Sequence, residues 1–307
     1  MSLYAAIKGN GPSGFGYGST AEDVTDGMDL SGKTYLLTGC NSGIGLETLR
    51  VLGLRGAHVI AAARTVDKAK QAAVSVGVEV TPVECELSEP ASVRACVQTV
   101  LATGRKLDGI LCNAGIMALP ELTLQHGYDL QFFTNHIGHF ILVTGLVDAL
   151  TDDGCVVMTS SDAHKQAPRV GVDLDNLDGS KGYWSWRSYG QSKFANLLLA
   201  KGLAMRFEGT KRTANAVHPG VISTNLVRHL NPLTAVGMAI AGPIALKTIP
   251  QGAATQVYAA VHPDAAKISG AYFKDCNVGT PRSPGADPEL AERLWEASEK
   301  IVSELPA

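Results

Sequence analysis

The chain has 307 residues, which is long enough for two average domains or for one large α/β domain. Its 26 basic and 29 acidic side chains give a net charge of −3, which excludes a nucleic-acid-binding protein that relies on overall positive charge. Hydrophobic residues make up 45% and aromatic residues only 6% of the chain, so the predicted core is mainly aliphatic.

Cysteine usage and apolar stretches indicate the compartment. The six cysteines form no Cys-x-x-Cys pair and lie mostly in apolar runs, which predicts buried, reduced thiols and a cytoplasmic location. The first 30 residues carry no apolar signal core, so we expect neither a secretory nor a mitochondrial signal. The longest apolar stretch, Leu233–Leu246, has 14 residues. A transmembrane helix needs about 20, and we expect none.

Residues 1–30 are expected to form a glycine-rich arm that does not pack, because Gly9–Thr20 consists largely of turn-forming residues. Beyond Lys33, short apolar runs alternate with segments of helical spacing. The predicted strands are Tyr35–Thr38, His58–Ala63, Val78–Val83, Leu107–Cys112, Cys155–Thr159 and Thr213–His218. The predicted helices are Ile44–Gly56, Val66–Val76, Ser92–Thr103, Leu122–Leu150 and Ser188–Phe207. This alternation predicts one α/β domain over residues 31–307, doubly wound, with a parallel sheet of about seven strands and helices on both faces.

Three glycine-rich segments match phosphate-binding patterns, and only one stands in the right place. Gly27–Thr34 fits a P-loop and Gly9–Gly14 fits a dinucleotide pattern, but neither follows a predicted strand. Thr38–Gly45 lies between a strand and an amphipathic helix, where glycines allow a tight turn and let a pyrophosphate approach the backbone. We expect this loop to bind a dinucleotide through Gly39, Asn41, Ser42, Gly43, Ile44 and Gly45.

The end of the second strand indicates which dinucleotide binds. An acid there usually binds the ribose 2′-hydroxyl of NAD. This chain has Ala63 followed by Arg64, whose planar guanidinium suits a phosphate, and this favours NADP(H) over NAD(H). The alternative is that Arg64 is a solvated residue at the start of the next helix.

Tyr189 and Lys193 form the candidate catalytic pair. They are four residues apart in a predicted helix, so both side chains project from one face. A neighbouring ammonium, helped by oxidised nicotinamide, is expected to lower the pKa of the phenol from about 10 and make it a usable proton donor or acceptor.

Together these motifs resemble the short-chain dehydrogenase/reductase family, which implies a Rossmann fold. The resemblance covers about residues 31 to 304 and includes a strand ending in Ser160-Ser161, the asparagine of Thr134-Asn135-His136, and the segment Cys112–Gly115. It implies that Ser161 polarises the substrate oxygen and that Asn135 holds a water that reaches Lys193. It further implies cofactor contacts by Tyr189 and Lys193 and by Glu86, Leu87, Asn113, Ala114, Gly115, Pro219, Gly220, Ile222 and Thr224.

Within the family, the chain is most similar to the retinol-dehydrogenase-like branch and to the oxidoreductase portion of the WW-domain-containing oxidoreductases. Ser161 and Tyr189 are 28 residues apart, which is longer than in most of the family, and Ser269–Phe273 also matches the branch. No WW domain fits in the first 30 residues. The chain departs from the family pattern at Cys112, Met158 and Glu86, none of which removes a catalytic group.

A lid over the substrate is expected at about residues 221–250, a segment without charge between Asn231 and Lys247. We interpret it as an apolar roof that selects a lipophilic substrate. A subunit contact and a shallow membrane contact are the alternatives. Tyr183, Trp184 and Trp186 precede the catalytic helix and either line the same mouth or serve as packing residues. His136 and His139 have a metal-binding spacing, but without a carboxylate or cysteine partner nearby we predict no metal site.

The sequence therefore predicts an NADP(H)-dependent oxidoreductase that transfers a hydride between nicotinamide and the carbonyl or alcohol carbon of a lipophilic alcohol, aldehyde or ketone. We expect no nucleic-acid partner, and the resemblance allows a homodimer or homotetramer. The alternative function is a catalytically silent dinucleotide-binding sensor or scaffold. Such proteins commonly lack the serine, tyrosine or lysine, and this chain has all three.

Overall fold

The computed structural model describes residues 8–222 and 246–306. A central sheet holds eight strands in this part of the chain, in the order β10-β9-β8-β7-β4-β1-β2-β3. All neighbouring strands pair in parallel except β9 and β10, which form an antiparallel hairpin at one edge. The strands are β1 (Thr34–Thr38), β2 (His58–Ala63), β3 (Val80–Glu84), β4 (Leu107–Cys112), β7 (Leu150–Thr159), β8 (Thr213–His218), β9 (Tyr272–Lys274) and β10 (Asn277–Gly279).

The strand order reverses next to β1, which is where a binding crevice is expected. From β1 the chain moves outward through β2 and β3, then returns to place β4 on the other side of β1. In doubly wound sheets, ligands bind at the carboxyl ends of the strands where the order reverses in this way. The residues that follow β1, β4 and β7 therefore meet at the edge where the predicted site residues lie.

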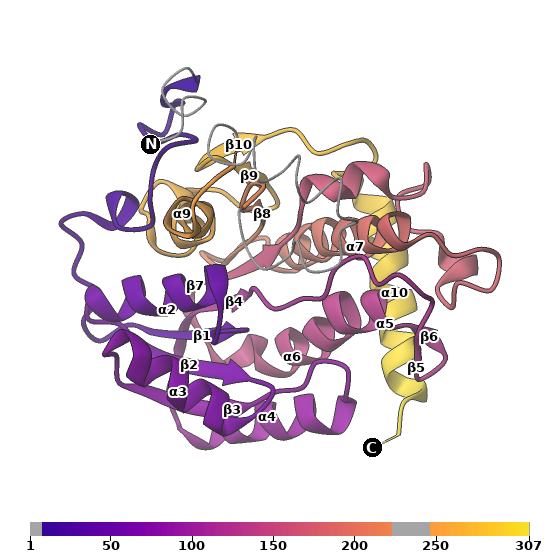
Figure 1. The fold of residues 1–307 in the computed structure, drawn as a ribbon, viewed down its shortest axis with the longest axis horizontal. Helices are drawn as coiled ribbons and strands as arrows, with labels where there is room; N and C mark the ends of the chain where they lie inside the picture. The colour runs from indigo at the N-terminus through magenta and orange to yellow at the C-terminus, as the bar shows by residue number, and fades with distance from the viewer. Residues whose placement is uncertain (1–7, 223–245, 307) are drawn as a thin grey trace.

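Helices cover both faces of the sheet (Figure 1). Side chains alternate between two cores: Leu36 of β1 faces the core beneath α4, α6, α7 and α10, whereas Tyr35 and Leu37 face the core beneath α2, α3 and α9. The larger helices are α2 (Gly43–Leu54), α3 (Val66–Val76), α4 (Pro90–Ala102), α6 (Gly138–Leu146), α7 (Ser185–Arg206), α9 (Ile249–Val261) and α10 (Pro288–Glu304). Short 3₁₀ helices are η1 (Asp23–Thr25), η3 (Val147–Ala149), η4 (Asp162–Gln166), η5 (Leu174–Asn176) and η7 (Ala265–Lys267).

The fold class is confirmed, and the differences are local. The sheet gains an antiparallel strand beyond the seven expected. The prediction of a single helix over Leu122–Leu150 is wrong. The segment begins instead with a two-stranded hairpin, whose tight turn is possible because Gly127 adopts a positive φ. The hairpin strands are β5 (Leu124–Gln125) and β6 (Tyr128–Asp129), and they are followed by α5 (Leu130–Phe132), the π-helical turn η2 (Phe133–Ile137) and α6.

The described part of the arm packs against the domain, which corrects the expectation that it does not pack. Ala21 and Val24 are buried against α9, and in Figure 1 the indigo chain passes beside that helix. The backbone amide of Ala21 donates to the carbonyl of Pro250 at 2.9 Å. Glycines and serines form the turns, as predicted, but the apolar residues between them find partners on the domain.

One described segment, Leu130–Ala149, is long and apolar enough to cross a membrane, with a mean hydropathy of 1.2. Within the fold, 78% of its most apolar window is buried. A core helix of a soluble protein has the same length and composition, and this segment packs under the sheet against α4.

Candidate active site

The glycine turn after β1 is shaped for close approach of a ligand to the backbone. Gly39 and Gly43 have φ angles of +67° and +53°, which side-chain-bearing residues rarely adopt. A Cβ atom on Gly45 would lie 2.0 Å from the carbonyl oxygen of Gly39, so only glycine fits there. Helix α2 begins at Gly43, and its cap residue, Ser42, makes no side-chain capping bond. The first-turn amides of α2 therefore remain available for a diphosphate, and this turn fits the dinucleotide that the sequence predicts.

The turn after β4 holds the glycine turn in place. Asn113 donates through Nδ2 to the carbonyl oxygens of Thr38 at 2.9 Å and Gly39 at 3.4 Å. The Thr38 hydroxyl in turn accepts from the backbone amides of Asn113 and Ala114, both at 3.0 Å. The predicted cofactor residues of these two loops are thus brought together.

The catalytic candidates meet on one side of the crevice. Tyr189 and Lys193 project from the same face of α7, with Lys193 Nζ 5.8 Å from the centre of the Tyr189 ring and both side chains buried. A side-chain hydrogen bond joins Tyr189 to Ser161, which follows β7. Lys193 Nζ also donates to the carbonyl of Thr159 at 3.1 Å. A Cβ atom on Gly115 would lie only 3.1 Å from Nζ, so the backbone after β4 passes directly over the ammonium.

The electrostatics of the protein alone differ from the sequence-based expectation. Burial raises the pKa of Tyr189 to about 12, and its hydrogen bond with Ser161 opposes the rise only in part. Burial also lowers the pKa of Lys193 to about 8. The predicted lowering of the phenol pKa by the ammonium together with oxidised nicotinamide stays a prediction, and in the protein without ligand desolvation raises that pKa instead. Lowering the phenol pKa requires a further positive charge in the crevice, which oxidised nicotinamide supplies when bound.

Asn135 lies in the π-helical turn η2, and its side chain is committed to the backbone of the neighbouring loop. Its Oδ1 accepts from the amide of Ile116 at 2.8 Å, and its Nδ2 donates to the carbonyl of Ile116 and the hydroxyl of Ser192, both at 2.9 Å. The asparagine thus fixes the Gly115–Ile116 backbone over Lys193. The water that the resemblance assigns to Asn135 stays a prediction, and this side chain already has three partners.

Three further cofactor candidates lie at the ends of β2 and β3. Arg64 follows the last residue of β2 and is exposed. Glu86 uses its carboxylate to accept from the amide and hydroxyl of Ser88, so it shapes the turn after β3. Leu87 is buried, with its backbone packed against Gly138. Their contacts with a dinucleotide stay predictions.

The segment after β8 forms the other wall. Pro219 and Ile222 are buried, and Gly220 has a φ of +99°. A Cβ atom on Gly252 would lie 2.3 Å from Ile222 Cδ1 and 3.5 Å from Ile44 Cγ1, so this wall meets the first turn of α2. Thr224 and most of the predicted lid lie outside the described residues.

Sequence reasoning missed some of the residues that organise the site. His139, considered only for metal binding, is buried and bonded to Thr38 Oγ1 and to the carbonyl of Asn135, each at 3.0 Å. His136 contacts Ser298 instead, so the two histidines have separate partners. Lys247 is buried against Gly220 although it is a lysine. For His139, the sequence did contain a signal: it lies four residues after Asn135 in a predicted helix, which places the two residues on the same face.

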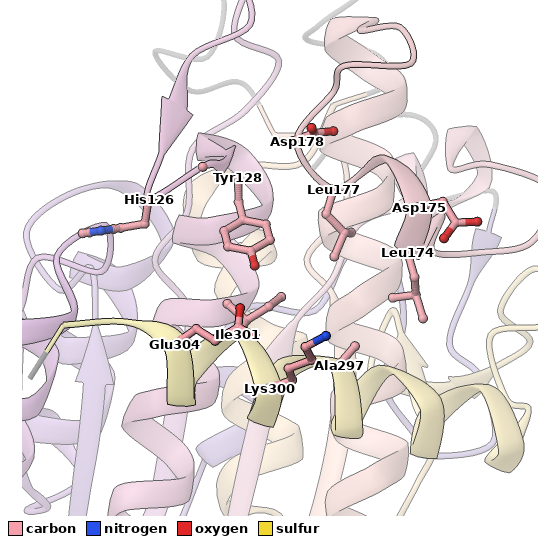
Figure 2. A pocket seen from close by; sticks show the side chains of 11 residues that line it. His126, Tyr128, Leu174, Asp175, Leu177, Asp178, Ala297, Lys300, Ile301 and Glu304 are labelled. Atoms are coloured by element: carbon pink, nitrogen blue, oxygen red, sulfur yellow. The ribbon is translucent and has the colours of Figure 1, made fainter.

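A hollow of about 500 Å³ lies elsewhere, between the β5–β6 hairpin, η5 and the end of α10 (Figure 2). Figure 2 shows His126 and Tyr128 on one side and Lys300, Ile301 and Glu304 of α10 on another. None of the catalytic candidates lines it. The chemistry of the crevice, rather than the size of a hollow, locates the candidate active site.

The comparisons with known proteins identify the family. Residues 33–234 match the family model described as short chain dehydrogenase. Short-chain dehydrogenase TIC 32 B, chloroplastic, of Brassica napus is 41% identical over the whole length of both chains. A WW domain-containing oxidoreductase of Danio rerio is 36% identical, covering 92% of this chain and 72% of that protein. Retinol dehydrogenase 12 of Mus musculus is 37% identical, covering 91% of this chain and 89% of that protein.

Among solved structures, an uncharacterized protein from Mycobacterium paratuberculosis is similar, with a TM-score of 0.74 and 32% identity. The match covers 92% of this chain and 98% of that one. The chain belongs to the short-chain dehydrogenase/reductase family, and its likeness to retinol dehydrogenases and WW domain-containing oxidoreductases is confirmed. It is therefore an NAD(P)-dependent oxidoreductase that acts on CH–OH or C=O groups.

Proposed function

We propose that this enzyme uses NADP(H) to interconvert a lipophilic alcohol and its aldehyde or ketone. The observation that carries the reaction is the convergence of Ser161, Tyr189 and Lys193 beside a glycine turn built for a diphosphate. When bound, the dinucleotide accepts or donates the hydride.

Each catalytic side chain keeps a donor or acceptor that the substrate or the cofactor can use. Ser161 Oγ accepts from the amide of Ala163 at 3.1 Å and is hydrogen-bonded to Tyr189, and a substrate oxygen between the two would take the Ser161 proton in place of the phenol. Tyr189 gives a proton to that oxygen in reduction and takes it back in oxidation. Lys193 uses one N–H for Thr159, which leaves two donors to hold the ribose and to favour the ionised phenol.

The preference for NADP(H) is proposed on the charges at the end of β2. Ala63 stands where an acid would repel a 2′-phosphate, and the exposed guanidinium of Arg64 follows directly. The test compares dissociation constants for NADPH and NADH. Replacing Arg64 with Ala should weaken NADPH binding about tenfold and leave NADH unchanged. Arg105→Ala, before the amino end of β4, is the control, and an unchanged NADPH to NADH ratio in Arg64→Ala contradicts the proposal.

The lipophilic substrate is proposed from the aromatic residues at the mouth. The ring of Trp186 meets the edge of the Tyr189 ring at a centroid distance of 6.1 Å, and Trp184 is 60% exposed. Retinol dehydrogenase 12, a relative, is named for a lipophilic alcohol. A subunit contact or a membrane contact of the 221–250 segment, the oligomeric state and the cytoplasmic location stay predictions.

The decisive experiment is NADPH oxidation with a panel of aldehydes, ketones and quinones of graded hydrophobicity. We expect the apolar members to be reduced fastest, and Tyr189→Phe to lower kcat by about 10²–10⁴-fold while NADPH still binds. Tyr183→Phe is the matched control, because Tyr183 bonds to the Leu119 carbonyl outside the catalytic group. Equal rates in Tyr189→Phe and wild type would refute the mechanism, and binding without any turnover would support a sensor or scaffold instead.

A further inference from the structure

Two lysines from distant parts of the chain share one carboxylate next to the active site. Lys247 is only 1% exposed, and its Nζ lies 2.8 Å from Asp275 Oδ1. Lys8 of the arm lies 2.7 Å from Asp275 Oδ2. Both ammonium groups also lie over the ring of Tyr17, at 4.9 Å and 5.2 Å from its centre. We call these four residues the arm cluster.

Lys247 contacts the wall that follows β8 with both its side chain and its backbone. A Cβ atom on Gly220 would lie 2.6 Å from Lys247 Cδ, so the lysine stem packs directly on the backbone of that glycine. The amide of Lys247 donates to the carbonyl of Val221 at 2.9 Å, and Lys247 pairs with Ile222 as in a parallel sheet. The position of Lys247 therefore determines the position of residues 220–222.

The arm holds the start of α9 by further hydrogen bonds. Gln251 Nε2 donates to the carbonyl of Gly18 at 3.2 Å, and Asn277 Nδ2 donates to the carbonyl of Phe15 at 3.0 Å. The aromatic ring of Phe15 contacts those of Tyr258 on α9 and of His262, which directly follows that helix. Residues 8–21 therefore span α9 and the β9–β10 hairpin, between which Lys247 is buried.

A buried lysine needs a reason, because desolvating its charge opposes folding unless a partner is held close. Here the partner is Asp275, whose pKa burial would raise, but Lys247 and Lys8 hold it below its usual value. The charged pair fixes the direction of the Lys247 stem, which an apolar side chain of the same length would leave free to change rotamer.

We propose that the arm cluster is a positioning element of the cofactor site, which holds residues 220–222, the segment that the family resemblance assigns to the nicotinamide end of the dinucleotide. Lys247 is its positioning residue, and Lys8 and Tyr17 make the arm part of the site. The proposal rests on dinucleotide binding as given under the proposed function. It predicts that damage to the cluster weakens contacts with the nicotinamide half and leaves the adenine half unaffected.

The test measures dissociation constants of two ligands for Lys247→Met and Tyr17→Leu. NADPH carries both halves of the dinucleotide, whereas adenosine 2′,5′-bisphosphate carries only the adenine half. Both variants should bind NADPH about tenfold more weakly, which corresponds to about 1.4 kcal/mol. Both should bind the bisphosphate as wild type does. In steady-state assays the KM for NADPH should rise more than kcat falls. Lys267→Met is the control, because the ion pair of Lys267 with Asp264 is exposed.

The affinities for the two ligands distinguish the proposal from its alternatives. Equal loss of affinity for both ligands, or unchanged affinity for NADPH, would overturn the proposal. Lys247→Met could fail to fold, which circular dichroism would show. In that case the affinities of Tyr17→Leu and Lys8→Met for the two ligands give the same comparison, because both variants keep the buried charge of Lys247. Failure of the wild-type protein to bind either ligand would instead refute the proposed use of NADP(H), which separates this proposal from the one on which it rests.

Discussion

His139 connects the π-helical turn that carries Asn135 to the cofactor turns through two hydrogen bonds. The carbonyl of Asn135 can only accept, so Nδ1 of His139 carries the ring proton. Burial lowers the pKa of His139 to about 4, so the ring is neutral and Nε2 accepts from the Thr38 hydroxyl. The oxygen of that hydroxyl accepts the amides of Asn113 and Ala114. One imidazole thus orients four groups of the site.

Replacing His139 with Phe should therefore loosen the cofactor turns. The Thr38 hydroxyl would lose a buried acceptor, at a cost of about 1–3 kcal/mol, and the affinity for NADPH should fall about tenfold or more. His139→Gln, which offers both a donor and an acceptor, should recover part of the affinity. Fluorescence titration with NADPH measures both variants, and wild-type affinity in a folded His139→Phe protein would contradict the assigned role.

At the scale of single residues, the sequence predicts which side chains belong to the site. It does not predict what those side chains contact. Spacing placed Tyr189 and Lys193 on one face of a helix, and the structure agrees. Spacing could not show that desolvation would raise the phenol pKa. It also could not show that the Asn135 side chain would hydrogen-bond to the backbone of Ile116. Those properties depend on which loop covers the group, and a local pattern contains no information about a loop that is distant in the sequence.

The turn that starts α2 shows how one element constrains a single residue. Alanine stabilises helices relative to glycine by about 1 kcal/mol, so propensity alone predicts that Gly45→Ala would be favourable. The structure predicts the opposite, because the added methyl group would lie 2.0 Å from Gly39 O and 2.6 Å from Asn113 Nδ2. We expect at least a hundredfold loss of NADPH affinity, measured by titration.

The matched control for this prediction is Gly202→Ala, in the middle of α7. Its Cβ atom would lie 3.2 Å from the Trp295 ring, a contact that a small shift of the ring relieves. Gly202→Ala should bind NADPH as wild type does. Similar affinities for Gly45→Ala and Gly202→Ala would show that the turn does not approach the ligand as closely as proposed.

Element by element, the regular part of the chain was predictable as far as His218. The strands β1, β2, β3, β4, β7 and β8 were found because each buries a regular face, as in Thr213–His218, whose bounds match, whereas α9, β9 and α10 were not predicted. The β5–β6 hairpin and the packed arm were missed. Their burial depends on single apolar residues, such as Val24 against α9, that have no period to detect.

At the scale of the whole molecule, buried ionisable groups determine how stability depends on pH. Burial lowers the pKa of His136 to about 3 and those of His139 and His164 to about 4. The unfolded chain therefore binds these three protons first as the pH falls below 6.5, and stability is lost between pH 6.5 and 4. Asp129 acts in the opposite direction between pH 6 and 3.8, because burial raises its pKa to about 6.

These four groups give the unfolded chain a net excess of two protons, and the lowered pKa values of His58, His218 and His262 act in the same direction. The free energy of unfolding should therefore fall by at least about 3 kcal/mol per pH unit near pH 5. Urea unfolding at pH 7, 6 and 5 measures this slope, and little change is expected between pH 8 and 7. His136→Phe should remove one proton from the slope, because burial keeps the ring neutral and Ser298 keeps its bond to the Leu294 carbonyl. A folded His136→Phe protein with the wild-type slope would show that this histidine is not buried neutral in solution.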